Sequence, residues 1–113
     1  MQKITIPASV SIDGVTYKVT AISAGACKNH KNLKTAVIGK NVLVVGKDAF
    51  YGCTRLKSIS MGENIRTIGN RAFYKCTAIN KIVIPNKVTR IGTQAFFGDK
   101  KLSNMNIQTL HLI

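Results

Sequence analysis

"IGNRAFYKC" at residues 68–76 has two variant copies in the chain, "VGKDAFYGC" at 45–53 and "IGTQAFFGD" at 91–99. The three copies begin at residues 45, 68 and 91, so the step between them is 23 residues. A phrase that recurs at a fixed step of 20 to 50 residues is the sequence signature of a solenoid. The phrase also contains Arg, Tyr, Lys and Cys, and the question is whether these residues do chemistry or packing.

The same 23-residue step extends over about 90 residues of the chain. Six apolar columns, each a set of positions one step apart, follow it: Leu33, Leu56, Ile79 and Leu102; Ala26, Ala49, Ala72 and Ala95; Ile22, Val45, Ile68 and Ile91; Cys27, Phe50, Phe73 and Phe96; Val19, Val42, Ile65 and Val88; Ile38, Met61, Ile84 and Ile107. A unit of this size cannot bury its apolar face alone, so neighbouring units must stack and share one continuous core.

Local spacing predicts the elements of one unit. Ile59 and Met61 alternate, as in a short strand, and residues 65–68 form a second extended piece closed by Gly69. The next apolar residues are spaced by three and four, which predicts a helical turn: Ala72, Phe73, Cys76 and Ile79. The predicted fold is a repeat solenoid, a right-handed coil with a parallel β-sheet, short second strands and helical turns. Gly46, Gly69 and Gly92 are predicted to be corners that require small size or positive φ.

The chain is predicted to be one domain, 1–113. Around Asp13-Gly14, apolar positions alternate on both sides, which predicts a hairpin extension at 10–19. The predicted units are an atypical N-terminal repeat 1–32, regular repeats 33–55, 56–78 and 79–101, and a partial C-terminal repeat 102–113. The final "LHLI", 110–113, is apolar and shows no cap, so we expect it to pack against a further repeat or, by self-association, against another copy.

These residues resemble the BspA-type (Treponema pallidum-type) leucine-rich repeats, whose pattern is L-x-x-I-x-I-P-x-x-V-x-x-I-G-x-x-A-F-x-x-C. "LKSISMGENIRTIGNRAFYKC" at 56–76 and "INKIVIPNKVTRIGTQAFFGD" at 79–99 follow it closely, and the resemblance covers residues 4 to about 107. The chain departs from the pattern where Cys27 replaces Phe, where His30 and Asp99 replace Cys, and where Gly39 and Gly62 replace Pro. The resemblance implies a surface-anchored or secreted bacterial protein that acts in adhesion.

The three cysteines do not form a recognisable reactive motif. Cys53 and Cys76 share one column, so stacked coils bring their backbones within about 5 Å of each other, a range at which a disulfide is sterically conceivable. The other reading is a pair of buried thiols that pack under the sheet, with Cys27 also pointing inward. No C-x-x-C, carboxylate pair or His cluster is present. We therefore predict no catalytic residue, no metal site, no cofactor and no enzymatic activity.

The charge is strongly basic, with 17 Lys and Arg against 4 Asp and Glu and a net charge of +13. Such a field favours anionic partners. One denser group of cations, the basic ridge, is predicted at the corner that leads into the first strand: Lys31, Lys34, Arg55, Lys57, Lys81, Lys100 and Lys101. It is either a solvated surface or an anion-binding footprint. Nucleic acid is disfavoured, because no aromatic residue is interleaved on the ridge for base stacking.

A second candidate surface is the face of the first strands that points away from the core. Small polar and β-branched residues are predicted there: Thr35, Val37, Ser58, Ser60, Lys81, Val83, Asn104 and Asn106. In leucine-rich repeats this face usually contacts the ligand. Val37 and Val83 suit a contact site, and they equally suit a strand.

The function predicted from these features is a non-enzymatic protein-interaction or adhesion module of a cell-surface or secreted protein, with a host or bacterial surface protein or glycan as partner. The alternatives are an architectural spacer in a longer array and a basic module that binds anionic glycan or nucleic acid. No apolar run approaches the roughly 20 residues needed to span a bilayer. The first 30 residues lack the pattern of a signal peptide, so the expected extracellular location comes from the resemblance.

Overall fold

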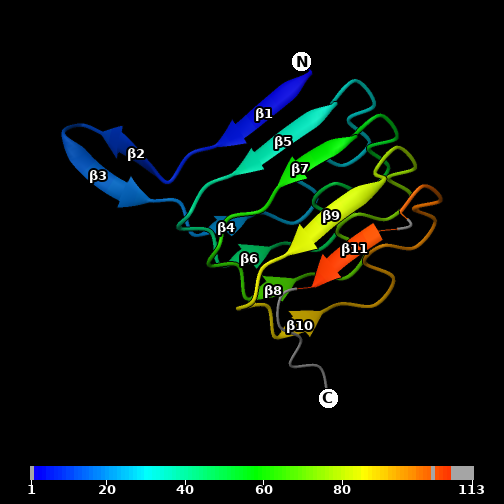
Figure 1. Ribbon diagram of the computed structural model, residues 1–113. Helices are drawn as coiled ribbons and strands as arrows, with labels where there is room; N and C mark the ends of the chain where they lie inside the picture. The colour runs from blue at the N-terminus through cyan, green and yellow to red at the C-terminus, as the bar shows by residue number, and fades with distance from the viewer. Residues whose placement is uncertain (1, 103, 108–113) are drawn as a thin grey trace.

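The computed structural model describes residues 2–102 and, for the backbone alone, strand residues 104–107. The chain winds into stacked coils, each of which contributes one longer strand and one two-residue strand (Figure 1). The longer, primary strands are β1 (Lys3–Ile6), β5 (Thr35–Ile38), β7 (Ser58–Ser60), β9 (Lys81–Ile84) and β11 (Asn104–Ile107). The second strands are β4 (Ala21–Ile22), β6 (Val44–Val45), β8 (Thr67–Ile68) and β10 (Arg90–Ile91).

The strand register follows the sequence repeat. The second strands form one parallel sheet in the order β10-β8-β6-β4, in which Ile22 pairs with Val45 and Val45 pairs with Ile68. Each of these pairs is one 23-residue step apart. Among the primary strands, β1, β5 and β7 form one parallel sheet, and β9 pairs with β11. The predicted repeat solenoid with parallel strands is therefore confirmed.

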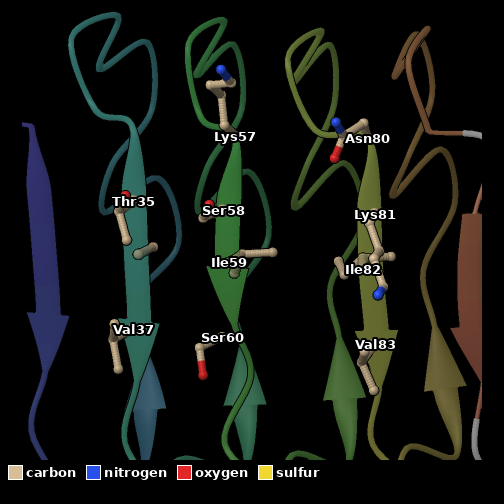
Figure 2. Close-up of a pocket in the computed structure, with 11 residues that line it drawn as sticks. Thr35, Val37, Lys57, Ser58, Ile59, Ser60, Asn80, Lys81, Ile82 and Val83 are labelled. Carbon is tan, nitrogen blue, oxygen red and sulfur yellow. The ribbon is translucent and has the colours of Figure 1, made fainter.

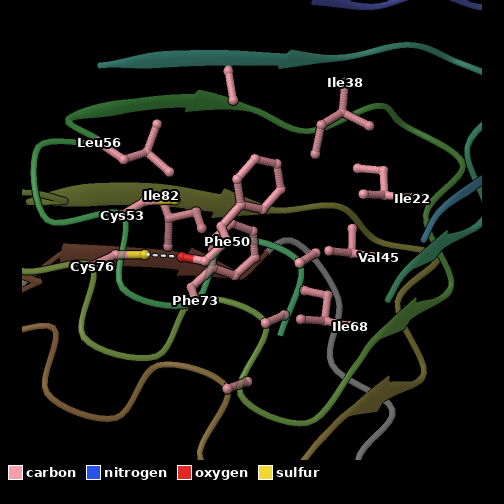
Figure 3. Close-up of a cluster of buried hydrophobic side chains, with 14 of the residues drawn as sticks. Ile22, Ile38, Val45, Phe50, Cys53, Leu56, Ile68, Phe73, Cys76 and Ile82 are labelled. Atoms are coloured by element: carbon pink, nitrogen blue, oxygen red, sulfur yellow. Dashed lines mark hydrogen bonds between the residues drawn. The ribbon is translucent and has the colours of Figure 1, made fainter. Parts of the chain in front are cut away.

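The core consists of the apolar columns. The largest fully buried side chains belong to them almost without exception: Leu33, Val42, Val45, Phe50, Leu56, Ile65, Ile68, Phe73, Ile79, Ile82, Ile84 and Val88. The Phe column stacks ring on ring, with centroids 5.3 Å apart for Phe50 and Phe73 and 5.5 Å apart for Phe73 and Phe96 (Figure 3). Each core side chain thus packs against its own equivalent in the next coil.

The predicted helical turn is wrong in detail, because the third side of each coil is a run of hydrogen-bonded turns. Alternate amides bond within the coil, as when Ala49 N–H donates to the Gly46 carbonyl at 3.2 Å. The amides between them donate to the next coil instead, as Phe50 N–H does to the Ala72 carbonyl at 2.7 Å. Asp48 has a φ of 58° and Gly52 a φ of 71°, and positive φ recurs at both equivalent positions in the next coils, so helical geometry is interrupted twice per coil. The three-and-four spacing of apolar residues persists, but no helix forms in the described residues.

The glycine corners are needed for their size. Gly46, Gly69 and Gly92 have no positive φ, so small size is the correct one of the two reasons that the sequence suggested. A Cβ added at Gly69 would lie 2.7 Å from Lys47 N and 2.8 Å from the Gly46 carbonyl carbon. Both are backbone atoms, which cannot move aside. The corner is therefore the point where the backbones of successive coils approach most closely.

The N-terminal hairpin consists of β2 (Ser9–Ile12) and β3 (Val15–Lys18), one residue before the predicted 10–19. It is joined by Asp13 and Gly14, both with positive φ, and it projects away from the stacked coils (Figure 1). β1 nevertheless pairs in register with β5, with Ile6 opposite Ile38. The hairpin therefore adds residues to the first coil without shifting its primary strand.

We predict that Gly69→Ala destabilises the protein more than Gly14→Ala. At Gly69 the added methyl group meets backbone of the preceding coil, and overpacking of this kind costs about 3 kcal/mol. At Gly14 nothing lies within 4 Å, so the cost is only that of a positive φ, about 1 kcal/mol. Chemical denaturation of the two variants measures the difference. Equal losses of stability would contradict the close-approach role of the corner.

Candidate functional site

The outer sheet face is the side of the primary strands that points away from the core. Burial alternates along β9, where Ile82 and Ile84 are buried while Lys81 and Val83 are exposed. The structure brings the described part of the predicted face together on this side: Thr35, Val37, Ser58, Ser60, Lys81 and Val83 (Figure 2). For Asn104 and Asn106 the backbone pairs with Lys81 and Val83, and their side chains lie outside the described part.

The outer sheet face is interrupted between β7 and β9. Lys57 N–H and Ser58 N–H both donate to the Lys34 carbonyl, at 3.0 and 3.2 Å, and this continues the ladder from β5 to β7. One coil later, the equivalent bonds from Asn80 and Lys81 to the Lys57 carbonyl are absent, and no ladder joins β7 to β9. We call this break the seam.

The seam is local, because the same two coils remain bonded elsewhere. Thr89 N–H donates to the Arg66 carbonyl at 2.9 Å, and Gly92 N–H donates to the Ile68 carbonyl at 2.8 Å. On the turn side, Phe73 N–H donates to the Ala95 carbonyl at 2.9 Å. The coils thus part only along their primary strands, and the core beneath stays closed on its other sides.

The inward side chains of β7 are less buried than those of neighbouring strands. Ile59 and Met61 are half-buried, whereas Ala36 is fully buried one coil earlier and Ile82 one coil later. In Figure 2 the Ile59 side chain points from β7 toward β9. The partial exposure of Ile59 therefore coincides with the missing ladder between β7 and β9.

A groove follows the seam. One hollow, of about 350 Å³, has lining residues on and beside β5, β7 and β9: Thr35, Ala36, Val37, Lys57, Ser58, Ile59, Ser60, Asn80, Lys81, Ile82 and Val83. A second hollow, of about 430 Å³, is lined by Ile59, Ser60, Met61, Glu63, Val83, Pro85 and Asn86. The two hollows share Ile59, Ser60 and Val83, so they form one continuous depression, the seam groove.

All residues of the predicted basic ridge are exposed, at the corner where each turn leads into a primary strand. Lys57 and Lys81 also line the seam groove, so the two predicted surfaces meet there. Among residues 2–102, the one ion pair lies elsewhere, between Arg71 Nε and Asp48 Oδ1 at 3.1 Å. The ridge cations therefore have no carboxylate partner within the described part of the chain.

A column of aromatic rings covers the turn side. Tyr51 stacks on Tyr74 at 4.8 Å and Tyr74 on Phe97 at 5.2 Å, measured between ring centroids. Lys28 Nζ lies 4.9 Å from the Tyr51 centroid. Because the stacked rings cover each other's faces, the faces between Tyr51, Tyr74 and Phe97 are not free to stack on a base or sugar.

The cysteines are buried free thiols (Figure 3). Cys53 Sγ donates to the Cys27 carbonyl, and Cys76 Sγ donates to the Phe50 carbonyl, both at 3.1 Å. Burial raises the pKa of Cys53 to about 11, and burial together with the negative charge of Asp99 raises the pKa of Cys76 further. The thiols pack and donate hydrogen bonds, and the "IGNRAFYKC" phrase is a structural one.

Asp99 takes the place of Cys in the same column, and the sequence analysis noted the exchange without seeing its consequence. Its carboxyl group is buried, with Oδ1 accepting the Cys76 N–H at 2.8 Å and Oδ2 without a partner. Burial raises the pKa of Asp99 to about 7, and the hydrogen bond from Cys76 opposes part of that rise. Asp99 is therefore the single titratable acid buried in the described core.

The repeat pattern predicts which residues lie on the outer sheet face, but it does not predict the seam groove. Ile59, Asn80 and Glu63 line the groove, and nothing in the repeat pattern separates Ile59 from its column neighbours. The predicted "LHLI" contact lies outside the described residues. Across residues 2–102, no cluster of three His, Cys, Asp or Glu side chains is placed to hold a metal ion, and no helix has the length and apolar character that a bilayer crossing requires.

The stacked coils, the 23-residue register and the exposed sheet face define a leucine-rich-repeat solenoid. Six copies of the BspA type leucine rich repeat region match residues 20–113, so the chain belongs to the BspA-type leucine-rich repeat family. None of the curated proteins compared with the chain matches it significantly.

Solved structures share this fold. A leucine-rich repeat protein from Bacteroides capillosus is 29% identical, with a TM-score of 0.86 over 94% of this chain and 76% of its own. A leucine rich cell surface protein from Faecalibacterium prausnitzii is 23% identical, with a TM-score of 0.63 over 96% of this chain and 48% of its own. The T. pallidum leucine rich repeat protein is 21% identical, with a TM-score of 0.69 over 96% of this chain and 72% of its own. The last two likenesses concern the fold alone.

We predict that the native protein is inert to a thiol reagent at mildly alkaline pH. The raised pKa of Cys53 leaves almost no thiolate at pH 8, and all three thiols are buried. Labelling with an aromatic disulfide reagent should be slow in buffer and should reach three thiols per chain in denaturant. Rapid labelling of the native protein would show that a thiol is accessible and reactive.

We also predict that stability falls as pH rises from about 4 to about 7. The folded-state pKa of Asp99, about 7, lies above the unfolded value near 3.9, so the folded protein holds a proton that the unfolded chain has released. Stability is therefore highest below the unfolded pKa, and the loss across the window is on the order of 2–4 kcal/mol. Thermal unfolding as a function of pH measures it.

Asp99→Cys should remove this pH dependence and raise stability at neutral pH. By equivalence with Cys53 and Cys76, the new thiol is placed to donate to the Phe73 carbonyl. Asp13→Asn, at an exposed turn acid, is the matched control and should leave the profile unchanged. A profile that survives in Asp99→Cys would mean that another group binds the proton.

Proposed function

We propose that the chain is a non-enzymatic protein-binding module of a cell-surface or secreted bacterial protein, and that the outer sheet face contacts the partner. The observation that supports this proposal most is the seam groove. It is the place where the described primary sheet leaves backbone groups unpaired and where apolar side chains are accessible beside cations. The side chains that recur between coils elsewhere are committed to the core.

Membership in the BspA-type family supports the surface location, and the F. prausnitzii structure with the same fold is described as a cell surface protein. The chain spans 48% of that protein's length. In a longer array, a set of coils that binds nothing would serve as an architectural spacer, and this is the first alternative.

The second alternative, a module that binds anionic glycan, is favoured by one observation. The ridge cations have no acidic partner among residues 2–102. Binding through such a surface depends on displaced counterions, so it must weaken steeply with salt. The seam groove, which also has apolar walls, predicts binding with a shallower response to salt.

The experiment is a binding screen of the immobilised protein against extracellular-matrix and epithelial-surface proteins, with heparin and single-stranded DNA as anionic probes, over a range of salt concentrations. The proposal predicts a protein ligand whose binding is lost in Ser60→Trp, which places a large ring where the two hollows meet, and retained in Ser11→Trp on the hairpin. Retention of heparin alone, with a steep salt response, would support the glycan alternative. No binding by any probe would support the spacer.

A further inference from the structure

We propose that the seam groove binds an extended peptide segment in which an acidic side chain lies two residues from an aliphatic one. This inference rests on the proposed function, because it names the chemistry of the partner at the outer sheet face. It is drawn from three features of the groove: its length, its unpaired backbone and its charge.

The length of the groove fits a short extended segment. On β7 and just beyond it, six of the seven residues from Lys57 to Glu63 line the groove. At about 3.3 Å per residue, this corresponds to roughly 20 Å, the span of about six extended residues.

The backbone along the seam is ready to bond a polypeptide. The Lys57 carbonyl would accept from Asn80 and Lys81 if the ladder continued, and it does not. Ser58 and Ser60 also line the groove, and their hydroxyl groups add further donors and acceptors. Main-chain hydrogen bonds supply affinity when an extended peptide lies on strand backbone, and side-chain contacts supply specificity.

The side chains around the groove select the acidic and aliphatic positions. Lys57 and Lys81 stand where β7 and β9 begin, and in Figure 2 Lys81 lies along β9 toward Val83. Val83, Ile59 and Val37 provide the apolar contact further along. Lys81 and Val83 are two residues apart on one face of the strand, about 7 Å, which is the separation of alternate side chains in an extended peptide.

The net charge argues against a second copy as the occupant. The hairpin of a second copy is an extended segment with exposed apolar side chains, Ile12 at 57% and Val15 at 52% exposure, so its shape alone would allow it to lie in the groove. Two copies at +13 each repel one another, whereas an acidic segment is attracted. Nucleic acid is also disfavoured, because no aromatic side chain lines the groove.

The test uses fluorescence polarisation of the intact protein with the labelled octapeptide Asp-Thr-Val-Thr-Asp-Thr-Val-Thr. One control peptide has Lys for Asp, and a second has Ser for Val. The first peptide should bind at least about tenfold more tightly than either control. Equal affinity for all three peptides, or no binding of the first, would overturn the proposal.

Variants locate the contact. The double variant Lys57→Glu/Lys81→Glu should weaken binding about tenfold, and the charge-matched Lys31→Glu/Lys100→Glu, away from the groove, should have a much smaller effect. Ser60→Trp should abolish binding, and Ser11→Trp should not. Unchanged thermal unfolding shows that each variant is folded. Equal effects of the two charge variants would mean that the peptide is held by non-specific electrostatic attraction, and this would contradict the groove as its binding site.

Two further outcomes separate this inference from the function it rests on. In the first outcome, Ser60→Trp loses a protein ligand but the intact protein does not bind the octapeptide. This result would support the proposed function and overturn the proposal that the ligand is an acidic–aliphatic segment. Sedimentation velocity at high protein concentration should show a monomer. A dimer that Ser60→Trp disperses would assign the groove to a second copy and overturn the inference as well.

Discussion

The close approach of one coil's backbone to the next is the constraint on which the rest of the structure depends. At Gly69 the neighbouring backbone lies too near for a side chain, and along the turns the amides of one coil bond the carbonyls of the next. Because the contact repeats every 23 residues, each side chain meets its own equivalent. Phe50 meets Phe73, and Cys76 donates to the Phe50 carbonyl where Cys53 donates to that of Cys27. A phrase that resembles an active site is therefore repeated for packing.

The core was predictable because its residues recur at equivalent positions of the 23-residue repeat. The buried positions of the regular coils, from Leu33 to Val88, are the ones that the 23-residue step identifies. The helical turn was not predictable from spacing, since apolar residues three and four apart suit a helix and a chain of turns equally. What decides between them is the division of amides between the coil and its neighbour, together with the positive φ of Asp48, Arg71 and Gln94.

The seam could not be predicted from the repeat pattern. Ile59 occupies a column of apolar residues like its neighbours, and the repeat predicts an uninterrupted ladder through β7 and β9. In the structure the ladder is missing there, and Ile59 is half-buried. A local break of this kind depends on how neighbouring side chains pack in three dimensions, and the spacing of residues in the sequence does not specify that packing. Asp99 differs, because its place in the Cys column is visible in the sequence, although the burial of its carboxyl group was not predicted.

Function in this chain is accordingly expected where the repetition fails. The inner positions are fixed by stacking, while the outer sheet face varies from coil to coil and carries cations without acidic partners in the described residues. At the seam groove an irregular backbone, an apolar wall and two lysines coincide. A surface of this kind suits the recognition of a partner by shape and charge, which is the function proposed for it.

Native-state hydrogen exchange measured by NMR tests the existence of the seam most directly. The amide of Ser58 bonds the Lys34 carbonyl, whereas the amide of Lys81, its equivalent one coil later, has no bond to Lys57. The account predicts that the Lys81 amide exchanges at least about tenfold faster than the Ser58 amide. Equal protection of the two amides would show that the ladder between β7 and β9 is intact, and it would remove the basis for a groove at this place.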